Sequence, residues 1–183
     1  MSFLRSGVVI CLVLLLFGLV SCTTQTQVTS TGTGATQAGG AGLWEKRAPF
    51  PSPRSEVTAA ALAGKVYVIG GLTPNAGVTR LVEAYDPISN SWQRRADLPV
   101  PLHHTAAVAL DDKVYVIAGF SGGFTPIDSV FAYDSNTDQW SARASLPTPR
   151  GAHAAAVVNG KIYVIGGVTG FGGDNIATLE VYD

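Results

Sequence analysis

Arginine side chains beside two proline-rich stretches are the first candidates for ligand recognition in this chain. Arg54 and Arg150 each close a Pro-x-Pro-Arg motif, and a guanidinium can hold a carboxylate through two parallel hydrogen bonds. An arginine can also pack inside a fold and donate to backbone carbonyls, so both roles remain open. Arg47, Arg95 and Arg143 recur in one repeated motif instead, and we interpret them as structural.

The three histidines do not have the spacing of a metal-binding set. His103 and His104 are adjacent, so on an extended strand their side chains point to opposite sides, which is poor geometry for one metal ion. His153 has no cysteine, histidine or carboxylate at ligand spacing. We therefore expect no metal site and no cofactor.

The sequence contains no recognisable catalytic nucleophile. It has no Gly-x-Ser-x-Gly motif, and both cysteines, Cys11 and Cys22, lie within the first 22 residues. The formal net charge is −1 and no run of lysine or arginine occurs, which argues against a nucleic-acid partner. We expect a binding module rather than an enzyme, and we assign no catalytic residue.

An internal repeat of 48 residues supplies the elements that must position these side chains. Trp44, Trp92 and Trp140 stand 48 residues apart, and each is followed by x-x-Arg-Ala. Self-similarity at a fixed spacing indicates a repeat architecture. The repeats run over about residues 51–98, 99–146 and 147–183, the third with one extra residue after its glycine pair.

Each repeat reads as four short strands without helical periodicity. An alanine-rich strand comes first, followed by a two-residue turn such as Asn159-Gly160 and then by a continuous apolar strand. A third strand ends at Tyr-Asp, and a fourth begins at Trp. Small residues suit strands that crowd around a central axis, and larger ones suit the outer strands. We therefore predict an all-β fold, a β-propeller of four-stranded blades.

The strand inventory predicts about three blades. It gives one lone fourth strand from Trp44, two sets of four strands, and three strands that end at Asp183, which makes twelve. A closed propeller has about 4–8 blades. We expect a truncated six- or seven-bladed propeller whose remaining blades come from a longer chain; in the alternative, two three-bladed chains pair to form the ring.

These spaced elements resemble the kelch repeat. Gly-Gly, then Tyr-Asp, then Trp at the sixth position after the Asp recur in register over residues 44–183. Ala118 departs from the pattern because it stands where the first glycine of a pair is expected. The resemblance implies a propeller that binds a protein or glycan through the loops of one face.

Two sets of loops are expected on that face: those that join one blade to the next, and those between the second and third strands of a blade. Their residues vary between repeats while the scaffold residues recur, as on a rigid scaffold with a recognition surface. Phe124 and Phe171 lie among glycines and can offer exposed rings to a sugar or peptide, or can cap a blade edge. The candidate ligand-binding residues are Arg54, Glu56, Arg80, His103, His104, Phe124, Asp128, Arg150, His153, Phe171, Asp174 and Asn175.

Two kelch enzymes define the alternative to a binding module. Galactose oxidase builds its cofactor from a Tyr–Cys crosslink, and this chain has no cysteine after residue 22. The periplasmic N-acetylneuraminate epimerase needs acid, base and arginine groups, which by resemblance Glu56, His104 and Arg150 can supply. A sugar-modifying activity of this kind remains the alternative function.

The N-terminal residues read as an export signal with a lipidation site. Arg5 precedes thirteen mostly apolar residues (8–20), fewer than the about 20 that a bilayer core requires and typical of a secretory signal. Leu19-Val20-Ser21-Cys22 resembles a bacterial lipobox, whose cysteine is acylated; an ordinary cleaved signal is the alternative. We expect a signal peptide (1–21), a flexible tether (22–43) and the propeller segment (44–183), anchored by lipid in the bacterial cell envelope, outside the cytoplasm, at the outer membrane or cell surface.

Overall fold

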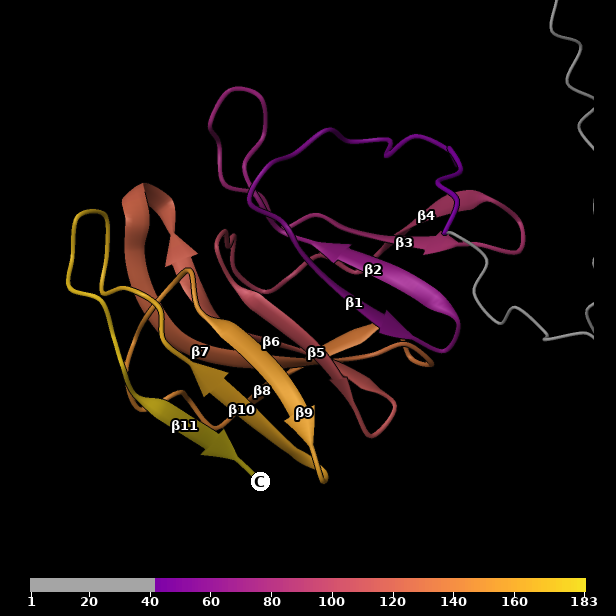
Figure 1. Ribbon diagram of the computed structural model, residues 1–183. Helices are drawn as coiled ribbons and strands as arrows, with labels where there is room; N and C mark the ends of the chain where they lie inside the picture. Colours follow the sequence, from indigo (N-terminus) through magenta and orange to yellow (C-terminus); the bar gives the residue numbers. More distant parts are fainter. Residues whose placement is uncertain (1–41) are drawn as a thin grey trace, which may run out of the picture. The chain divides into compact units, whose positions relative to one another are not determined.

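Short apolar runs separated by tight turns form eleven strands in residues 42–183, the part of the chain that the computed structural model describes. They make three antiparallel sheets, each from strands that follow one another in the sequence (Figure 1). The first blade contains β1 (Thr58–Leu62), β2 (Lys65–Ile69), β3 (Val82–Asp86) and β4 (Ser91–Arg95). The second contains β5 (Ala106–Leu110), β6 (Lys113–Ser121), the 3₁₀ turn η1 (Gly122–Phe124), β7 (Thr125–Asp134) and β8 (Gln139–Arg143). The third contains β9 (Ala154–Val158), β10 (Lys161–Ile165) and β11 (Leu179–Tyr182).

The core lies between neighbouring blades. Tyr67 and Ile69 of the first blade belong to one buried cluster with Val114 and Val116 of the second. A second cluster joins the other face of the second blade to β10 of the third. The apolar strand β6 is therefore buried between two sheets, and the predicted all-β propeller class is confirmed.

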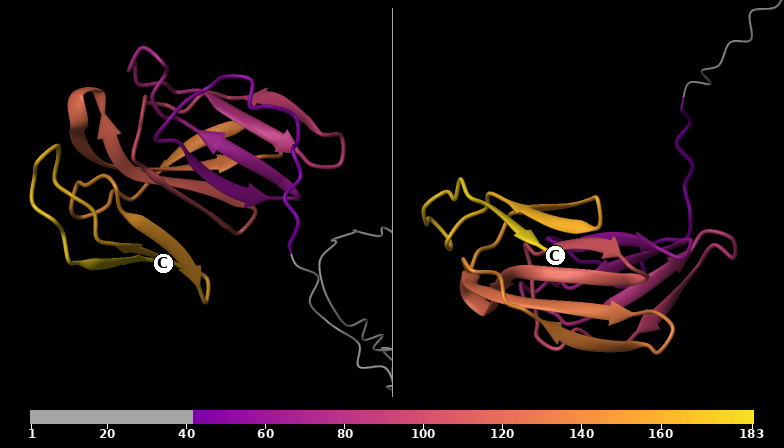
Figure 2. Two further views of the ribbon diagram at one scale, coloured as in Figure 1. Left: turned by 45° about the horizontal axis from the view of Figure 1, so that its top comes forward. Right: turned by 90° about the horizontal axis from the view of Figure 1, so that it is seen from below.

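The alanine-rich strands are the innermost ones. β1 lies beside β5, and β5 lies beside β9, so the first strands of the three blades come together (Figures 1 and 2). Alanine side chains such as Ala60 and Ala106 leave room for this close approach, and both are buried. The prediction of small residues on the axis side is confirmed by this packing.

The first hairpin turn of each blade has the geometry that its residues favour. Asn159 and Gly160 have φ angles of +50° and +75°, and the corresponding residues of the other two blades also have positive φ. Two consecutive left-handed residues fit the right-handed twist of the flanking strands, and Asn-Gly adopts them most readily. This hairpin was predicted correctly from the sequence.

The recurring Trp and Tyr residues join each blade to the segment before it. Trp140 Nε1 donates a hydrogen bond to the Ala96 carbonyl (2.9 Å), and the Ala96 amide donates to Asp138 Oδ1 (2.9 Å). The Tyr133 hydroxyl donates to the same Asp138 carboxylate at 2.6 Å. Ala48, Tyr85, Asn90 and Trp92 repeat this arrangement in the first blade. The repeated motif is therefore a set of contacts between blades.

The expected lone strand at Trp44 is absent from the described residues, which corrects the count of twelve strands. Trp92 and Trp140 lie on strands that pair with the third strand of their own blade, at Tyr85 and Tyr133. No such third strand lies beside Trp44 within residues 42–183, and its side chain is fully exposed. A strand needs a hydrogen-bonded neighbour, and this segment has none there.

Ala118, the departure from the glycine pair, still adopts the backbone conformation of a glycine. Its φ is +48°, against +63° for Gly70 and +66° for Gly166. It sits in a bulge of the β6–β7 pairing, and β6 continues through it to Ser121. The longer β6–β7 hairpin has Phe124 at its end, in the 3₁₀ turn η1.

Candidate functional site

The loops between β2 and β3, β6 and β7, and β10 and β11 lie on one side of the three blades (Figure 1). The segments that connect one blade to the next pair with these loops, through the bridges Ser55–Leu72, His103–Phe120 and Gly151–Val168. We call this surface the loop face. Most of the predicted site residues lie in these loops and segments, and several of them do not reach solvent.

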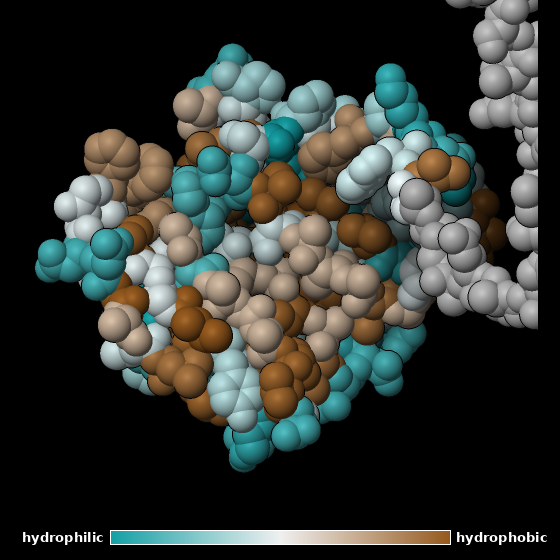
Figure 3. Space-filling model, in the orientation of Figure 1, coloured by the Kyte–Doolittle hydropathy of each residue, from teal (hydrophilic) through white to brown (hydrophobic). Residues whose placement is uncertain are grey.

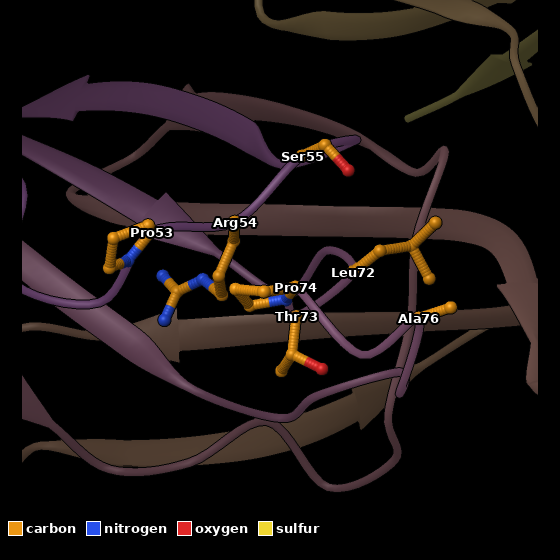
Figure 4. A pocket seen from close by; sticks show the side chains of 7 residues that line it. All are labelled: Pro53, Arg54, Ser55, Leu72, Thr73, Pro74 and Ala76. Carbon is orange, nitrogen blue, oxygen red and sulfur yellow. The ribbon is translucent and has the colours of Figure 1, made fainter.

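Arg54 is part of the scaffold. Its side chain is only 1% exposed, its Nη1 lies 3.1 Å from Glu83 Oε2, and its guanidinium stacks over the Phe50 ring. None of its nitrogen atoms makes a well-aligned hydrogen bond, and burial lowers its pKa against the opposing effect of Glu83. A cavity of about 460 Å³ opens beside it, but the guanidinium points away from Leu72 and Ala76 on the far side (Figure 4).

Arg150 is also buried, and its guanidinium is bound by other groups of the protein. Its side chain is 0% exposed and lies 2.8 Å from Glu180 Oε2. It donates hydrogen bonds to the carbonyls of Thr148 and Gly166 and to the Thr178 hydroxyl. Of the two alternatives left open for these arginines, the structure shows the packed one for both. Neither is placed to clamp a carboxylate of a ligand.

The second blade holds apolar residues at the same positions. Leu102 takes the place of Arg54 and Arg150, and Phe131 takes the place of Glu83 and Glu180. Both Leu102 and Phe131 are buried. The buried ion pair is thus one of two interchangeable ways to fill this space, which explains why these arginines vary between repeats without facing a ligand.

His103 and His104 point toward each other, which corrects the expectation that they point to opposite sides. Their Nδ1 atoms lie 2.7 Å apart, and His104 Nε2 lies 3.1 Å from Glu56 Oε2. The expectation assumed an extended strand, but His104 has a left-handed φ of +49°, which turns its side chain back toward its neighbour. Three polar groups from two blades therefore form one chain.

The hydrogen bonds of this chain depend on which imidazole nitrogens carry protons. With a neutral His104 whose Nε2–H donates to the Glu56 carboxylate, its Nδ1 accepts and His103 Nδ1–H is the donor between the rings. His103 is buried, and burial together with the charge of a protonated His104 lowers its pKa.

Aromatic rings cover this polar chain. Phe124 packs against both imidazoles, with ring centroids 4.9 Å from His103 and 5.5 Å from His104. Phe171, from the β10–β11 loop, lies 5.2 Å from Phe124 and is 84% exposed. Phe120 supports the group from below and is buried. We call this group the rim cluster; it consists of Glu56, His103, His104, Phe120, Phe124 and Phe171.

His153 is not part of the rim cluster, and its surroundings differ from those of His103 and His104. Both of its ring nitrogens are buried and make no well-aligned hydrogen bond. Burial and then the nearby charge of Arg150 lower its pKa to about 4, with the Ile117 carbonyl opposing the shift only in part. It is therefore a half-buried, neutral side chain at neutral pH and does not present a charge to a ligand.

The remaining predicted residues lie on the periphery. Arg80 is exposed and reaches the Pro99 carbonyl at 3.5 Å, and Asp128 is half-buried in β7. Asp174 and Asn175 are exposed at the tip of the β10–β11 loop. Cys22, the predicted lipidation site, lies outside the described residues.

Two structural features bear on metals and membranes. Within residues 42–183, His, Cys, Asp and Glu side chains form no group of three or more that could hold a metal ion. The same residues include no helix that is long and apolar enough to cross a membrane.

Three residues of this region were missed by the sequence analysis. Glu83 and Glu180 are the partners of the two arginines, and Phe120 is the support of the rim cluster. The sequence did contain a signal for the two glutamates. The position of Glu83 and Glu180 holds glutamate in the repeats whose proline motif ends in arginine, and it holds phenylalanine in the repeat whose motif ends in leucine. Phe120 follows the glycine pair at a position that is apolar in all three blades.

Comparison with known proteins identifies the repeat. The family model described as the KLHDC2/KLHL20/DRC7 Kelch-repeats domain matches residues 33–167. A search of the curated proteins gave no match.

Proposed function

The chain belongs to the kelch-repeat family, and on this basis we propose that it is a lipid-anchored, extracytoplasmic module that binds a protein through its rim cluster. Kelch domains generally mediate protein interactions. The observation that carries the proposal is the exposed Phe171 ring, which packs on Phe124 beside the His104–Glu56 pair. Exposed aromatic residues beside polar groups are typical of binding surfaces.

The rim cluster has the rigidity that recognition requires. Glu56, His104 and Ala152 occupy the same position in successive blades, all with positive φ, and backbone hydrogen bonds link them: the His104 amide donates to Glu56 and the Ala152 amide donates to His104. Non-glycine residues pay a steric cost for this conformation, and such residues often occur at functional sites. The two side chains are thus fixed from below while the phenylalanines come from longer loops.

The enzyme alternative loses one of its three groups. Glu56 and His104 are partly exposed, but Arg150 is fully buried against Glu180. A sugar carboxylate bound at the rim would therefore pair with neither Arg54 nor Arg150, because both are buried against glutamates. We retain a glycan ligand only as an outcome of the tests.

Site-specific photo-crosslinking tests protein binding. Replacing Phe171 with p-benzoylphenylalanine in the full chain in its own cell should give a crosslinked protein, identified by mass spectrometry. The matched control carries the same group at Ile88, which is 96% exposed on the β3–β4 turn. A protein adduct at position 171 and not at 88 supports the proposal, whereas no protein adduct at 171 overturns it.

Lipid anchoring has its own test. Cys22→Ala should abolish labelling by a palmitate analogue and leave the precursor uncut, since lipoprotein signal peptidase acts on the acylated cysteine. Wild-type protein without lipid, together with a variant still cut before residue 22, would contradict the anchor and leave the rim proposal untouched.

A further inference from the structure

The free charge on the loop face is negative. Arg54 and Arg150, the two cations nearest the centre of the predicted site, are buried and compensated by Glu83 and Glu180. The ring nitrogens of His153 are buried, and its side chain is neutral at neutral pH. The positive charges that the sequence suggested at Arg54, Arg150 and His153 are therefore unavailable to a ligand.

The exposed charges near the rim cluster are carboxylates. The Glu56 side chain is 46% exposed, and it pairs with the His104 side chain. Asp174 is exposed three residues after Phe171 on the same loop. Arg80, the exposed cation among the predicted site residues, lies in the first blade and leans on the Pro99 carbonyl. A ligand that contacts the rim cluster thus meets an exposed carboxylate at Glu56 and, on the Phe171 loop, a second one at Asp174.

The aromatic part of the cluster favours the same kind of ligand. The face of a phenylalanine ring attracts a cation within about 6 Å of its centroid. Contacts run without a break from Phe171 through Phe124 and His104 to Glu56, at 5.2, 5.5 and 3.1 Å. The stem of a lysine or arginine side chain can pack on these rings while its charge reaches a carboxylate at the edge of the cluster.

We propose that the rim cluster selects a basic segment of a partner protein, whose lysine or arginine side chains pack on the Phe171 and Phe124 rings and pair with the carboxylates of Glu56 and Asp174. This inference rests on the proposed function and names the chemistry of its partner. An acidic segment would place its charge against Glu56 and Asp174 without a counter-ion, because both central arginines are already paired.

Peptide selection tests the inference on the full chain. A phage-displayed decapeptide library is selected against the immobilised protein, and the enriched peptides are resynthesised with a fluorescent label for anisotropy measurements. The expected peptides contain lysine or arginine, bind at least tenfold more weakly when these are changed to glutamate, and lose affinity as salt is added.

Variants of the protein locate the site. Phe171→Ala and Glu56→Gln should each weaken binding about tenfold, and Glu56→Gln should also reduce the dependence on salt. Ile88→Ala and Asp112→Asn, matched exposed residues on β-turns away from the loop face, should leave binding unchanged. Circular dichroism of each variant checks that the fold is retained.

The outcomes separate this inference from the function on which it rests. Enriched peptides that depend on Phe171 but are acidic or uncharged overturn the basic-segment inference and leave protein binding standing. No peptide that depends on Phe171, or retention of a glycan alone, overturns both.

Discussion

In the first and third blades a buried arginine faces a glutamate, whereas the second blade has Leu102 and Phe131 at the same two positions. The third member of the set changes with them: Ser52 and Thr148 donate hydrogen bonds to the glutamates, and Val100 replaces them in the second blade. The three blades thus fill the same space in two ways, with an ion pair or with two apolar side chains. Removing one partner of a buried ion pair is costly, but replacing both with apolar groups is often neutral.

Exchanging the pair of the first blade for that of the second tests this at single residues. Arg54→Leu should lower the free energy of unfolding by about 3 kcal/mol, because Glu83 is left buried without a cation. Arg54→Leu combined with Glu83→Phe should recover most of the loss. Urea unfolding of both single variants and the double variant measures the coupling; losses that simply add would contradict interchangeable packing.

His153 makes the folded state sensitive to mild acid. Its pKa is lowered from 6.5 to about 4, so the unfolded chain takes up a proton first and stability falls as the pH drops from about 6.5 to about 4. The shift corresponds to at most roughly 3 kcal/mol. His103, whose pKa is also lowered from 6.5, adds to the loss in the same range. Asp134 and Asp138, whose pKa values are lowered, act only at more acidic pH, below their ordinary value of 3.8.

The effect of His153 on acid stability can be tested with the residue that the first blade has at the same position. Valine stands at position 57, the counterpart of His153, so His153→Val should fold and should flatten the stability curve between pH 6.5 and 4. Unfolding in urea at a series of pH values measures it. A variant with the same loss of stability over this range as the wild type would show that another group causes the loss.

At the level of elements, the β9–β10 turn has the residues, Asn159 and Gly160, that favour the left-handed conformation most among the three equivalent hairpin turns. Gly160 has a φ of +75° and an added Cβ would meet nothing within 4 Å, so only backbone conformation distinguishes it from alanine. Gly160→Ala should cost about 1 kcal/mol. At the counterpart Asp112, with φ +58°, Asp112→Gly should stabilise by roughly 0.5–1 kcal/mol. Thermal unfolding measures both, and equal signs of the two effects would contradict the explanation.

The elements could be predicted from the sequence because their signals are local and repeated. The hairpin turns, the apolar second strands and the tryptophans such as Trp140, which bonds to Ala96, recur every 48 residues, so each assignment is supported by more than one copy. The rim cluster could not be predicted, because it joins loops of different blades. Phe124 and Phe171 meet only after the second and third blades pack, and the orientation of His104 depends on a left-handed φ that histidine does not signal.

At the level of the whole unit, the third blade presents a face that the other two bury. Ile117 of the second blade is 2% exposed because the third blade covers it, whereas its counterpart Ile165 is 49% exposed. Leu179 and Val181 of β11 are about equally exposed, at 56% and 51%. Figure 3 shows hydrophobic side chains spread over this region of the inner and third-blade strands. An apolar surface of this kind favours association.

Residues 44–183 expressed alone should therefore associate, and the third blade should be the reason. β11 also offers an edge with unpaired backbone groups within the described residues, which adds to the tendency. Ile165→Glu places a charge on the exposed face and should shift the segment toward the monomer in sedimentation velocity at micromolar concentration, with little change in stability. The matched Ile117→Glu puts the same charge into the packed interface between the second and third blades and should unfold the segment. A wild-type segment that sediments as a compact monomer at these concentrations would show that the exposed face does not drive association.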